Sequence, residues 1–432
     1  MVWMDANNKR HNHFHKQQHI AVVTMGVKLG GETRGYTRFR TIAEMLVEQG
    51  FRVDLITTNF QHWDKAHRDT TQECYQGLPY RILFIEEPGY SKNLDLTRIK
   101  SHAQAAKNLR RLFDTIAGPY DLIYAEIPPN DVARVCAEFA VENNIPFVAD
   151  INDLWPEAMS ITIKNRLLKK IAMPIISATT SFAADARVTY QLLSGAIGTS
   201  DEYTARPALD RAEPYPRATV YVGNKLAEFD AGAARYLGEI DKPSAEFWVT
   251  YAGTLGASYD LHTLVKAAAI IRNQAAQKSE LAFLRVKILG DGPERGSLEA
   301  LTHELDAPVD FCGYVEFPQM AAYLSLSDIV VNSLKKDAAQ SIVGKIGDYL
   351  ASGSPIINTG SSKEFCNKVN KDGFGINVEA ENPQALAQAI TDLCHRKSQR
   401  KMMGSKGRAI AEKEFDQPRS YQKISDLIKT LL

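Results

Sequence analysis

The chain has 432 residues, which is long enough for two domains of about 150–200 residues that each bury a substantial core. Hydrophobic residues make up 44% and charged residues 24%, a globular balance that excludes a disordered chain and a membrane-spanning one. Lysine plus arginine and aspartate plus glutamate number 51 each, so no overall charge attracts nucleic acid and any anion site must be local.

The first 18 residues are polar and contain no apolar run that could serve as a signal peptide. We expect a disordered tail there, with metal binding by His11, His13 and His15 as a less favoured alternative. The five cysteines lie far apart and form no CxxC pair, which argues against a structural zinc site or a disulfide framework. This cysteine usage predicts a reducing, cytoplasmic compartment.

The first half of the chain begins with a strand, HIAVVTMG (residues 19–26), a glycine-rich loop, LGGETRGYTR, and a helix, TRFRTIAEMLVEQG. A second apolar run, FRVDLITT (residues 51–58), completes a βαβ unit with a parallel sheet. Further strands are predicted at residues 80–87, 120–127, 146–153, 195–200 and 219–223.

The pattern restarts at FWVTYAGTLG (residues 247–256), where an apolar strand runs into a glycine loop and then into the helix LHTLVKAAAIIRNQ. Further strands are predicted at residues 284–294, 309–315, 329–334 and 354–360. The fold class is therefore α/β, with two Rossmann-like doubly wound domains and a boundary between residues 224 and 244. Parallel strands present their carboxyl ends to ligands, so we expect the two domains to face each other across a cleft.

Two glycine loops follow strands and precede helices, at Gly30–Gly31 and at Gly253 with Gly256. Glycine there lets backbone amides approach a phosphate, and a helix N-terminus adds a favourable partial charge. Each loop can equally be a tight turn and nothing more, because neither is a full GxGxxG fingerprint or a P-loop.

A more specific series of motifs lies in the second half: GTLG, then ILGDGPE (residues 288–294), FCGYV (residues 311–315) and AQSIVGKIGDYLASGSPII (residues 339–357). This series resembles the donor half of family-4 glycosyltransferases of the GT-B fold. In the first half, IYAEIPPN (residues 123–130) and ADINDLWPE (residues 149–157) are similar to segments of bacterial glycosyltransferases that build capsular, exopolysaccharide or O-antigen repeat units.

The resemblance implies a metal-independent, retaining glycosyltransferase with a nucleotide-sugar as donor substrate, UDP-sugar being favoured, and with no cofactor. The acceptor would be a polyprenyl-diphosphate-linked sugar or an oligosaccharide, nucleic acid would not be a partner, and the protein would be cytoplasmic or peripheral on the inner membrane. The domains would be an acceptor-binding one at 19–224, a nucleotide-sugar-binding one at 225–414 and a C-terminal helix at 415–432 that packs back on the first. Two alternatives stay open, an epimerase of the same fold and a catalytically silent partner that binds nucleotide-sugars.

The same resemblance assigns donor-binding residues, among which Asp348 would grip the ribose hydroxyls. They are Gly30, Gly31, Gly253, Thr254, Leu255, Gly256, Gly290, Gly292, Tyr314, Val315, Ser341, Val343, Gly344 and Asp348. The chain departs from the family pattern where two glutamates seven residues apart are usual, because Gln340 and Asp348 occupy those positions. Gln340 keeps hydrogen bonding but lacks the charge that would stabilise a positive transition state.

The basic pair that often follows GTLG is also missing, which makes Lys345 the expected cation for the donor phosphates. The alternative for Lys345 is a solvated lysine at a helix start. Glu126 occupies a position where relatives often carry a histidine, and either an action on the acceptor hydroxyl or a structural pairing fits it. Asp153 is a better functional candidate than Asp150, because the Trp155-Pro156 pair fixes the backbone after it.

Two basic amphipathic segments in the first half suit an anionic membrane surface. They are KNRLLKKIAMPII (residues 164–176) and RIKSHAQAAKNLRRLF (residues 98–113). Each alone can be an ordinary surface helix, and together they favour peripheral binding near a lipid-linked acceptor.

Overall fold

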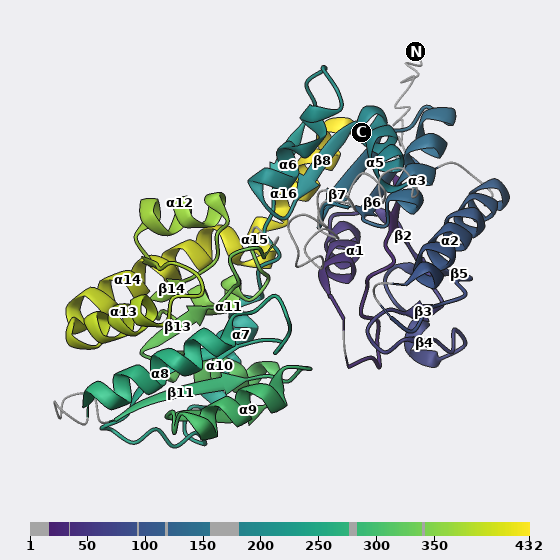
Figure 1. Cartoon of the computed structure of the whole chain (residues 1–432). Helices are drawn as coiled ribbons and strands as arrows, with labels where there is room; N and C mark the ends of the chain where they lie inside the picture. Colours follow the sequence, from purple (N-terminus) through teal and green to yellow (C-terminus); the bar gives the residue numbers. More distant parts are fainter. Residues whose placement is uncertain are drawn as a thin grey trace, which may run out of the picture. The chain divides into compact units, whose positions relative to one another are not determined.

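The computed structural model describes residues 17–33, 35–92, 95–116, 120–155, 181–275, 283–338 and 342–432. Within these ranges the chain forms two large sheets flanked by helices (Figure 1), which confirms the predicted α/β class with two Rossmann-like domains. The chain divides after Val148 into two compact units.

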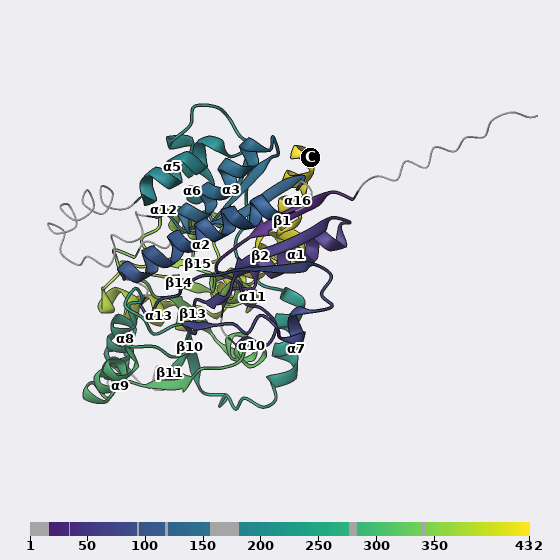
Figure 2. The same ribbon diagram turned by 90° about the vertical axis from the view of Figure 1, so that its right-hand side faces the viewer.

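The first large sheet has the strand order β5-β2-β1-β6-β7-β8-β9. Its strands are β1 (His19–Val23), β2 (Arg52–Thr58), β5 (Arg81–Ile85), β6 (Leu122–Ile127), β7 (Phe147–Ile151), β8 (Gly195–Gly198) and β9 (Arg217–Thr219). β1 pairs in parallel with both β2 and β6, and Figure 2 shows β1 and β2 side by side. Ile20, Ala21 and Val22 are fully buried, as expected of a parallel strand that is covered on both faces.

The helices around these strands bury one apolar stripe each. They are α1 (Arg38–Glu48), α2 (Leu96–Thr115), α3 (Asn130–Glu142), α5 (Phe182–Leu192) and α6 (Asp201–Ala205). α1 buries Phe39, Ile42 and Leu46, the spacing of one helical face. α2 packs on α3 through Phe113 and Phe139, whose stacked rings lie 4.4 Å apart. A short antiparallel hairpin, β3 (Phe60–Gln61) with β4 (Ala66–His67), follows β2 and was not predicted.

The second large sheet is parallel throughout, with the order β12-β11-β10-β13-β14-β15. Its strands are β10 (Phe247–Ala252), β11 (Leu284–Leu289), β12 (Val309–Gly313), β13 (Ile329–Asn332), β14 (Ile356–Asn358) and β15 (Gly375–Asn377). Its helices are α7 (Leu226–Tyr236), α8 (Leu261–Ala275), α9 (Arg295–Glu304), α10 (Phe317–Leu326), α11 (Ile346–Ala351), α12 (Lys363–Asp372), α13 (Pro383–His395) and α14 (Lys397–Ile410). α8 and α9 lie side by side in Figures 1 and 2.

Successive residues of the central strands enter opposite cores of this second domain. Val331 and Ile357 pack with residues of α8 and α13, whereas Val330 and Ile356 pack with residues of α7, α10 and α11. The alternation follows from the two-residue period of a strand, and it explains why consecutive residues of β13 and β14 are apolar up to the final Asn332 and Asn358.

When the strands are numbered along the chain, the second sheet has the order 3-2-1-4-5-6, and the first has the same order with a seventh strand at its end, 3-2-1-4-5-6-7. The order reverses at the first strand, between β1 and β6 in one sheet and between β10 and β13 in the other. Ligands of such sheets bind beyond the carboxyl ends of the strands at this reversal. We therefore expect ligands to bind near the residues that follow β1 and β10.

The strands predicted between residues 19 and 200 and between 247 and 360 are all present, within a few residues of their predicted ends. The strand predicted at residues 219–223 was misplaced, because β9 covers only Arg217–Thr219. β15 was not predicted, since three residues carry too little periodicity to separate a strand from a loop.

The last segment of the chain consists of a π-turn (Ala411–Phe415), α15 (Gln417–Ser420) and α16 (Gln422–Leu431). α16 packs on β8 and β9. The rings of Phe415 and Tyr221 stack at 4.5 Å, and the Tyr421 hydroxyl donates to the Val222 carbonyl at 3.0 Å. The segment thereby fixes residues 221–224, which lead from the first sheet into α7.

Candidate functional site

The carboxyl end of β1 holds the side chain of Glu126, which projects from the end of β6. Its Oε2 accepts hydrogen bonds from the Thr24 hydroxyl at 2.5 Å and from the backbone amides of Met25 and Gly26, both at 3.2 Å. Three donors orient this half-buried carboxylate at the point where the strand order reverses. These donors are two backbone amides and a hydroxyl, and both interpretations of Glu126, an action on the acceptor hydroxyl and a structural pairing, stay open.

The glycine loop at Gly30–Gly31 folds back on neighbouring loops of the same unit. Gly31 adopts a φ of +79°, which favours glycine, and Gly30 accepts a hydrogen bond from the Cys74 thiol at 3.4 Å. Glu32 then pairs with the buried Arg68, whose Nε lies 2.6 Å from Oε1. Turn geometry therefore accounts for Gly31, whereas a Cβ on Gly30 would meet Cys74 at an ordinary contact distance of 3.5 Å. The predicted role of both glycines in holding a donor stays a prediction.

The loop after β10 is packed against the loop after β11 through backbone contacts. Gly253 donates to the Leu289 carbonyl at 2.8 Å, and Leu255 donates to the Asp291 carbonyl at 3.0 Å. A Cβ on Gly290 would lie 2.0 Å from the Gly253 oxygen, and one on Gly292 would lie 2.4 Å from the Leu255 oxygen. Gly290 and Gly292 of the GDGP motif are thus required for close loop packing, whereas a Cβ on Gly256 would meet only the Thr254 methyl group at 3.6 Å. The amides of Gly253 and Leu255 already have partners.

Lys345 reaches the loop after β10 from the residue before α11. Its Nζ donates to the Tyr251 hydroxyl at 2.8 Å and lies 4.0 Å and 3.9 Å from the ring centres of Tyr251 and Tyr259. A Cβ on Gly253 would collide with this ammonium group, so glycine makes room for it. Cation–π contacts of this kind hold an ammonium in place while leaving its charge uncompensated.

Burial lowers the pKa of the Lys345 ammonium well below its usual value, and the neighbouring Asp348 carboxylate acts in the opposite direction. An anion bound beside Lys345 would restore the charged form. The lysine is therefore not the solvated surface side chain that the sequence left as an alternative.

Asp348 lies on α11, three residues after Lys345. Its Oδ1 accepts a hydrogen bond from the Asn224 amide at 2.7 Å, while the Oδ1 of Asn224 is buried without a hydrogen-bond partner. Burial raises the pKa of Asp348 to about 7, and the Asn224 bond and Lys345 oppose this shift. A carboxylate with a raised pKa next to an ammonium with a lowered one is typical of a binding or catalytic site.

Four further predicted residues lie in the loops that follow β12 and precede α11. Tyr314 is 69% exposed, and Val315 is partly buried against the core that includes α7 and α10. Val343 is buried, whereas Gly344 is exposed with the Val222 side chain nearby. Gln340 and Ser341 lie outside the described residues.

Asp153 is engaged locally. Its Oδ1 accepts from the Leu154 amide at 2.8 Å and its Oδ2 from the Trp155 indole at 3.3 Å. Asp150 is fully buried, and the Asn152 side chain donates to its backbone carbonyl at 3.0 Å. These contacts fix the turn after β7, and a catalytic role for Asp153 stays a prediction.

Sequence reasoning missed the residues that hold the charged groups. Thr24 donates a hydrogen bond to Glu126, and Asn224 donates one to Asp348. The rings of Tyr251 and Tyr259 contact the ammonium group of Lys345. Tyr251 could have been noticed, because it is an aromatic residue with a polar hydroxyl in the second-last position of an otherwise apolar strand. Nothing in the local sequence marks Asn224 as a partner of a residue 124 positions away.

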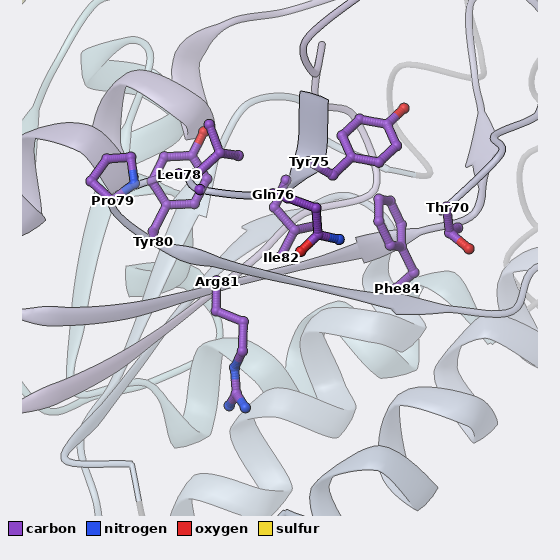
Figure 3. A pocket seen from close by; sticks show the side chains of 10 residues that line it. Thr70, Tyr75, Gln76, Leu78, Pro79, Tyr80, Arg81, Ile82 and Phe84 are labelled. Atoms are coloured by element: carbon purple, nitrogen blue, oxygen red, sulfur yellow. The ribbon is translucent and has the colours of Figure 1, made fainter. Parts of the chain in front are cut away.

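A cavity of about 370 Å³ lies elsewhere, at the outer strand β5, and contains none of the predicted residues. In Figure 3, Tyr75, Gln76 and Phe84 lie on one side of the strand and Arg81 extends to the other. Arg81 forms a two-bond ion pair with Asp54, with its Nε 2.9 Å from Oδ1. Neither Glu126, Lys345 nor Asp348 lines this cavity.

Within the described ranges no three His, Cys, Asp or Glu side chains gather in a way that could hold a metal ion. None of the described helices has the length and hydropathy that a membrane crossing requires. On the basic helix α2, Arg110 pairs with Glu142 and Arg98 lies over the Tyr90 ring, while Lys100, Lys107 and Arg111 are exposed. The other basic segment, residues 164–176, lies outside the described residues.

Comparison with known proteins agrees with this geometry. Residues 246–396, which run from β10 to the end of α13, match the family described as Glycosyl transferases group 1. A search of curated protein sequences finds no significant match.

Many solved structures share the fold of the whole chain. Sucrose-phosphate synthase from Thermosynechococcus elongatus has a TM-score of 0.68 at 16% identity, over 96% of this chain and 99% of that one. Anabaena HepE in complex with UDP has a TM-score of 0.66 at 16% identity, over 96% and 100%. WaaG, a glycosyltransferase involved in lipopolysaccharide biosynthesis, has 0.64 at 14% identity, over 95% and 99%. The predicted GT-B fold is thereby confirmed.

Proposed function

We propose that this protein is a retaining glycosyltransferase that moves a sugar from a nucleotide-sugar to a lipid-linked or oligosaccharide acceptor in the synthesis of surface polysaccharide. The match of residues 246–396 to a glycosyltransferase family supports the reaction class. HepE, which shares the fold, is solved with UDP and with UDP-glucose, which supports UDP-sugar as the donor.

One observation carries the proposal: the ammonium group of Lys345 at the carboxyl end of β10, held between two tyrosine rings. A nucleoside diphosphate gains negative charge as the bond to its sugar breaks, and a positioned cation stabilises that gain in the transition state. Burial has already removed water from Lys345, so little reorganisation is needed when the charge appears.

Asp348 supplies the second half of the donor site in this proposal. Its carboxylate would accept hydrogen bonds from the ribose hydroxyls, with Asn224 keeping it oriented. The donor diphosphate would lie between Asp348 and the glycine loop after β10, where Thr254 and Gly256 supply backbone. Gln340 would hydrogen-bond the transferred sugar.

The reaction balances without a cofactor. The bond from the anomeric carbon to the diphosphate oxygen breaks, the acceptor oxygen bonds to that carbon on the same face, and the departing oxygen takes the acceptor's proton. Attack on the face that the leaving group vacates retains the anomeric configuration. The exposed cations of α2 would bring the protein to the anionic inner surface of the membrane.

Thermal unfolding of the purified full chain with UDP, GDP, dTDP and their sugars tests this function, because a ligand that binds the native state raises the melting temperature. We expect a rise with UDP and UDP-sugars, and release of UDP when membrane lipid extract is added. An epimerase would convert the donor without any acceptor, and a silent binding partner would bind UDP without turnover.

A further inference from the structure

Two aromatic side chains lie beside the carboxyl end of β1 and are not part of the site described above. Tyr36 is 61% exposed, and Trp63 is partly exposed on the loop of the β3–β4 hairpin. Their ring centres are 5.1 Å apart and their planes are perpendicular. Aromatic rings that are exposed and in contact with each other are typical of a ligand-binding surface, because part of their apolar area is not buried in a core.

The fold fixes the position of Trp63. The side chain of buried Gln61 accepts hydrogen bonds from the amides of Trp63, at 2.5 Å, and Asp64, at 3.0 Å. Gly35 has a φ of +129°, and a Cβ there would lie 3.0 Å from Cε3 of the indole. Glycine at this position therefore lets the indole lie directly on the loop that carries Tyr36.

Trp63 is also a neighbour of the Glu126 carboxylate. The point where a Cβ on Gly26 would lie is 3.3 Å from Oε1 of Glu126 and 3.6 Å from Cη2 of Trp63. The indole of Trp63 and the carboxylate of Glu126 thus both lie next to Gly26, which has no side chain to separate them. All of these residues belong to the unit that ends at Val148.

This combination matches the chemistry of a sugar ring. The faces of aromatic rings carry partial negative charge, which suits the slightly positive C–H face of a pyranose. A carboxylate accepts hydrogen bonds from hydroxyls, and it repels phosphate. A neutral ring rich in hydroxyls satisfies both groups, whereas a phosphorylated group would lie against Glu126 at an electrostatic cost.

We propose that the sugar ring of the acceptor lies against the perpendicular rings of Trp63 and Tyr36, on the face of one and at the edge of the other, with Glu126 beside it to accept a hydrogen bond from the attacking hydroxyl. We call this pair of rings the platform. The proposal rests on the glycosyltransferase function proposed above and specifies its acceptor as a saccharide whose accepting ring carries no phosphate. Trp63 and Tyr36 are binding residues that decide which acceptor is used.

Saturation-transfer NMR on the full chain loaded with UDP tests the platform, with the octyl glycosides of glucose, galactose, mannose and N-acetylglucosamine as probes. We expect at least one glycoside to receive saturation at its ring protons. Trp63→Ala should weaken that binding about tenfold or more, and Trp63→Phe should restore most of it. Phe283→Ala, which removes another exposed aromatic ring, should leave it unchanged.

Absence of UDP binding to folded wild-type protein would overturn the proposed function itself. UDP binding with no saturation of any glycoside, or undiminished saturation in folded Trp63→Ala, would overturn the platform alone. A loss of UDP binding in Trp63→Ala and in Trp63→Phe would assign the rings to the nucleotide and equally overturn the acceptor role. Circular dichroism of each variant separates these results from unfolding.

Discussion

The carboxyl ends of β1 and β10 occupy equivalent places in two sheets of the same strand order, and they carry opposite charges. At β1 three donors hold the carboxylate of Glu126. At β10 two tyrosine rings hold the ammonium of Lys345, which reaches a glycine loop. Strand order therefore decides where a site lies, and the side chains that the crossovers deliver decide what it binds.

In the proposed reaction, the two opposite charges would bind different substrates. A diphosphate is attracted to the end of β10 and repelled from the end of β1, whereas a neutral polyhydroxyl group is accepted at β1. The glycines differ as well. Gly290 allows backbone to meet backbone, Gly253 makes room for the Lys345 side chain, and Gly26 leaves a space between two side chains.

The largest expected effect separates the two kinds of glycine. Gly290→Ala should destabilise the protein by about 3–5 kcal/mol, because the new Cβ would lie 2.0 Å from the Gly253 oxygen and the φ is +131°. Gly26→Ala, with no such φ and a nearest contact of 3.3 Å, should cost no more than about 1 kcal/mol. Urea unfolding measures both, and equal losses would show that the β10 and β11 loops can move apart.

Removing the cation tests the end of β10 directly. Lys345→Met keeps most of the bulk on the tyrosine rings, and turnover should fall about 100-fold or more, which is roughly 2.7 kcal/mol of transition-state stabilisation. UDP affinity should change less, because the charge matters most as the bond breaks.

Lys363→Met, an exposed lysine at the start of α12, is the matched control and should be neutral. Steady-state kinetics and calorimetry with UDP give the two quantities. Normal turnover in a folded Lys345→Met enzyme would mean that other groups hold the diphosphate.

A smaller effect is expected at the end of β1. Glu126→Gln retains an oxygen that can accept from Thr24 and the two amides, but it removes the charge. Transfer to acceptor should fall about tenfold while UDP affinity stays the same, since the carboxylate acts on the acceptor. Glu138→Gln on α3 serves as the control. Weaker UDP binding in Glu126→Gln would instead indicate that the donor binds at β1.

The last effect concerns stability and pH. The pKa of Asp348 is about 7 in the fold and 3.8 without it, so the folded protein loses stability as pH rises from about 4 to about 7. Asp348→Asn has no carboxylate to ionise, and its stability relative to the wild type should therefore increase over that window and level off above it. Thermal unfolding at pH 4 to 8 measures the difference, and a constant difference would mean that Asp348 is ionised throughout.

Single residues show which parts of the candidate site could be predicted from the sequence. Gly253, Gly290 and Gly292 were recognised as special from their motifs, but as ligand-binding residues. Close backbone packing requires glycine at the last two, and the Lys345 side chain together with a φ of +145° requires it at the first. Lys345 was selected by elimination of other cations, and its aromatic partners were not foreseen. The Asn224 contact to Asp348 could not be predicted, because no local pattern links residues so far apart.

By itself the sequence determined the α/β class, the two repeats of strand and helix and the places of the glycine loops, because strand alternation and helical periodicity are local properties. Tertiary structure alone decided that Thr24 meets Glu126 across 102 positions, that Tyr251 meets Lys345 across 94, and that Asp348 is buried enough to raise its pKa. These depend on long crossovers that bring the ends of distant strands together and on the water that packing excludes, and neither leaves a local trace in the chain.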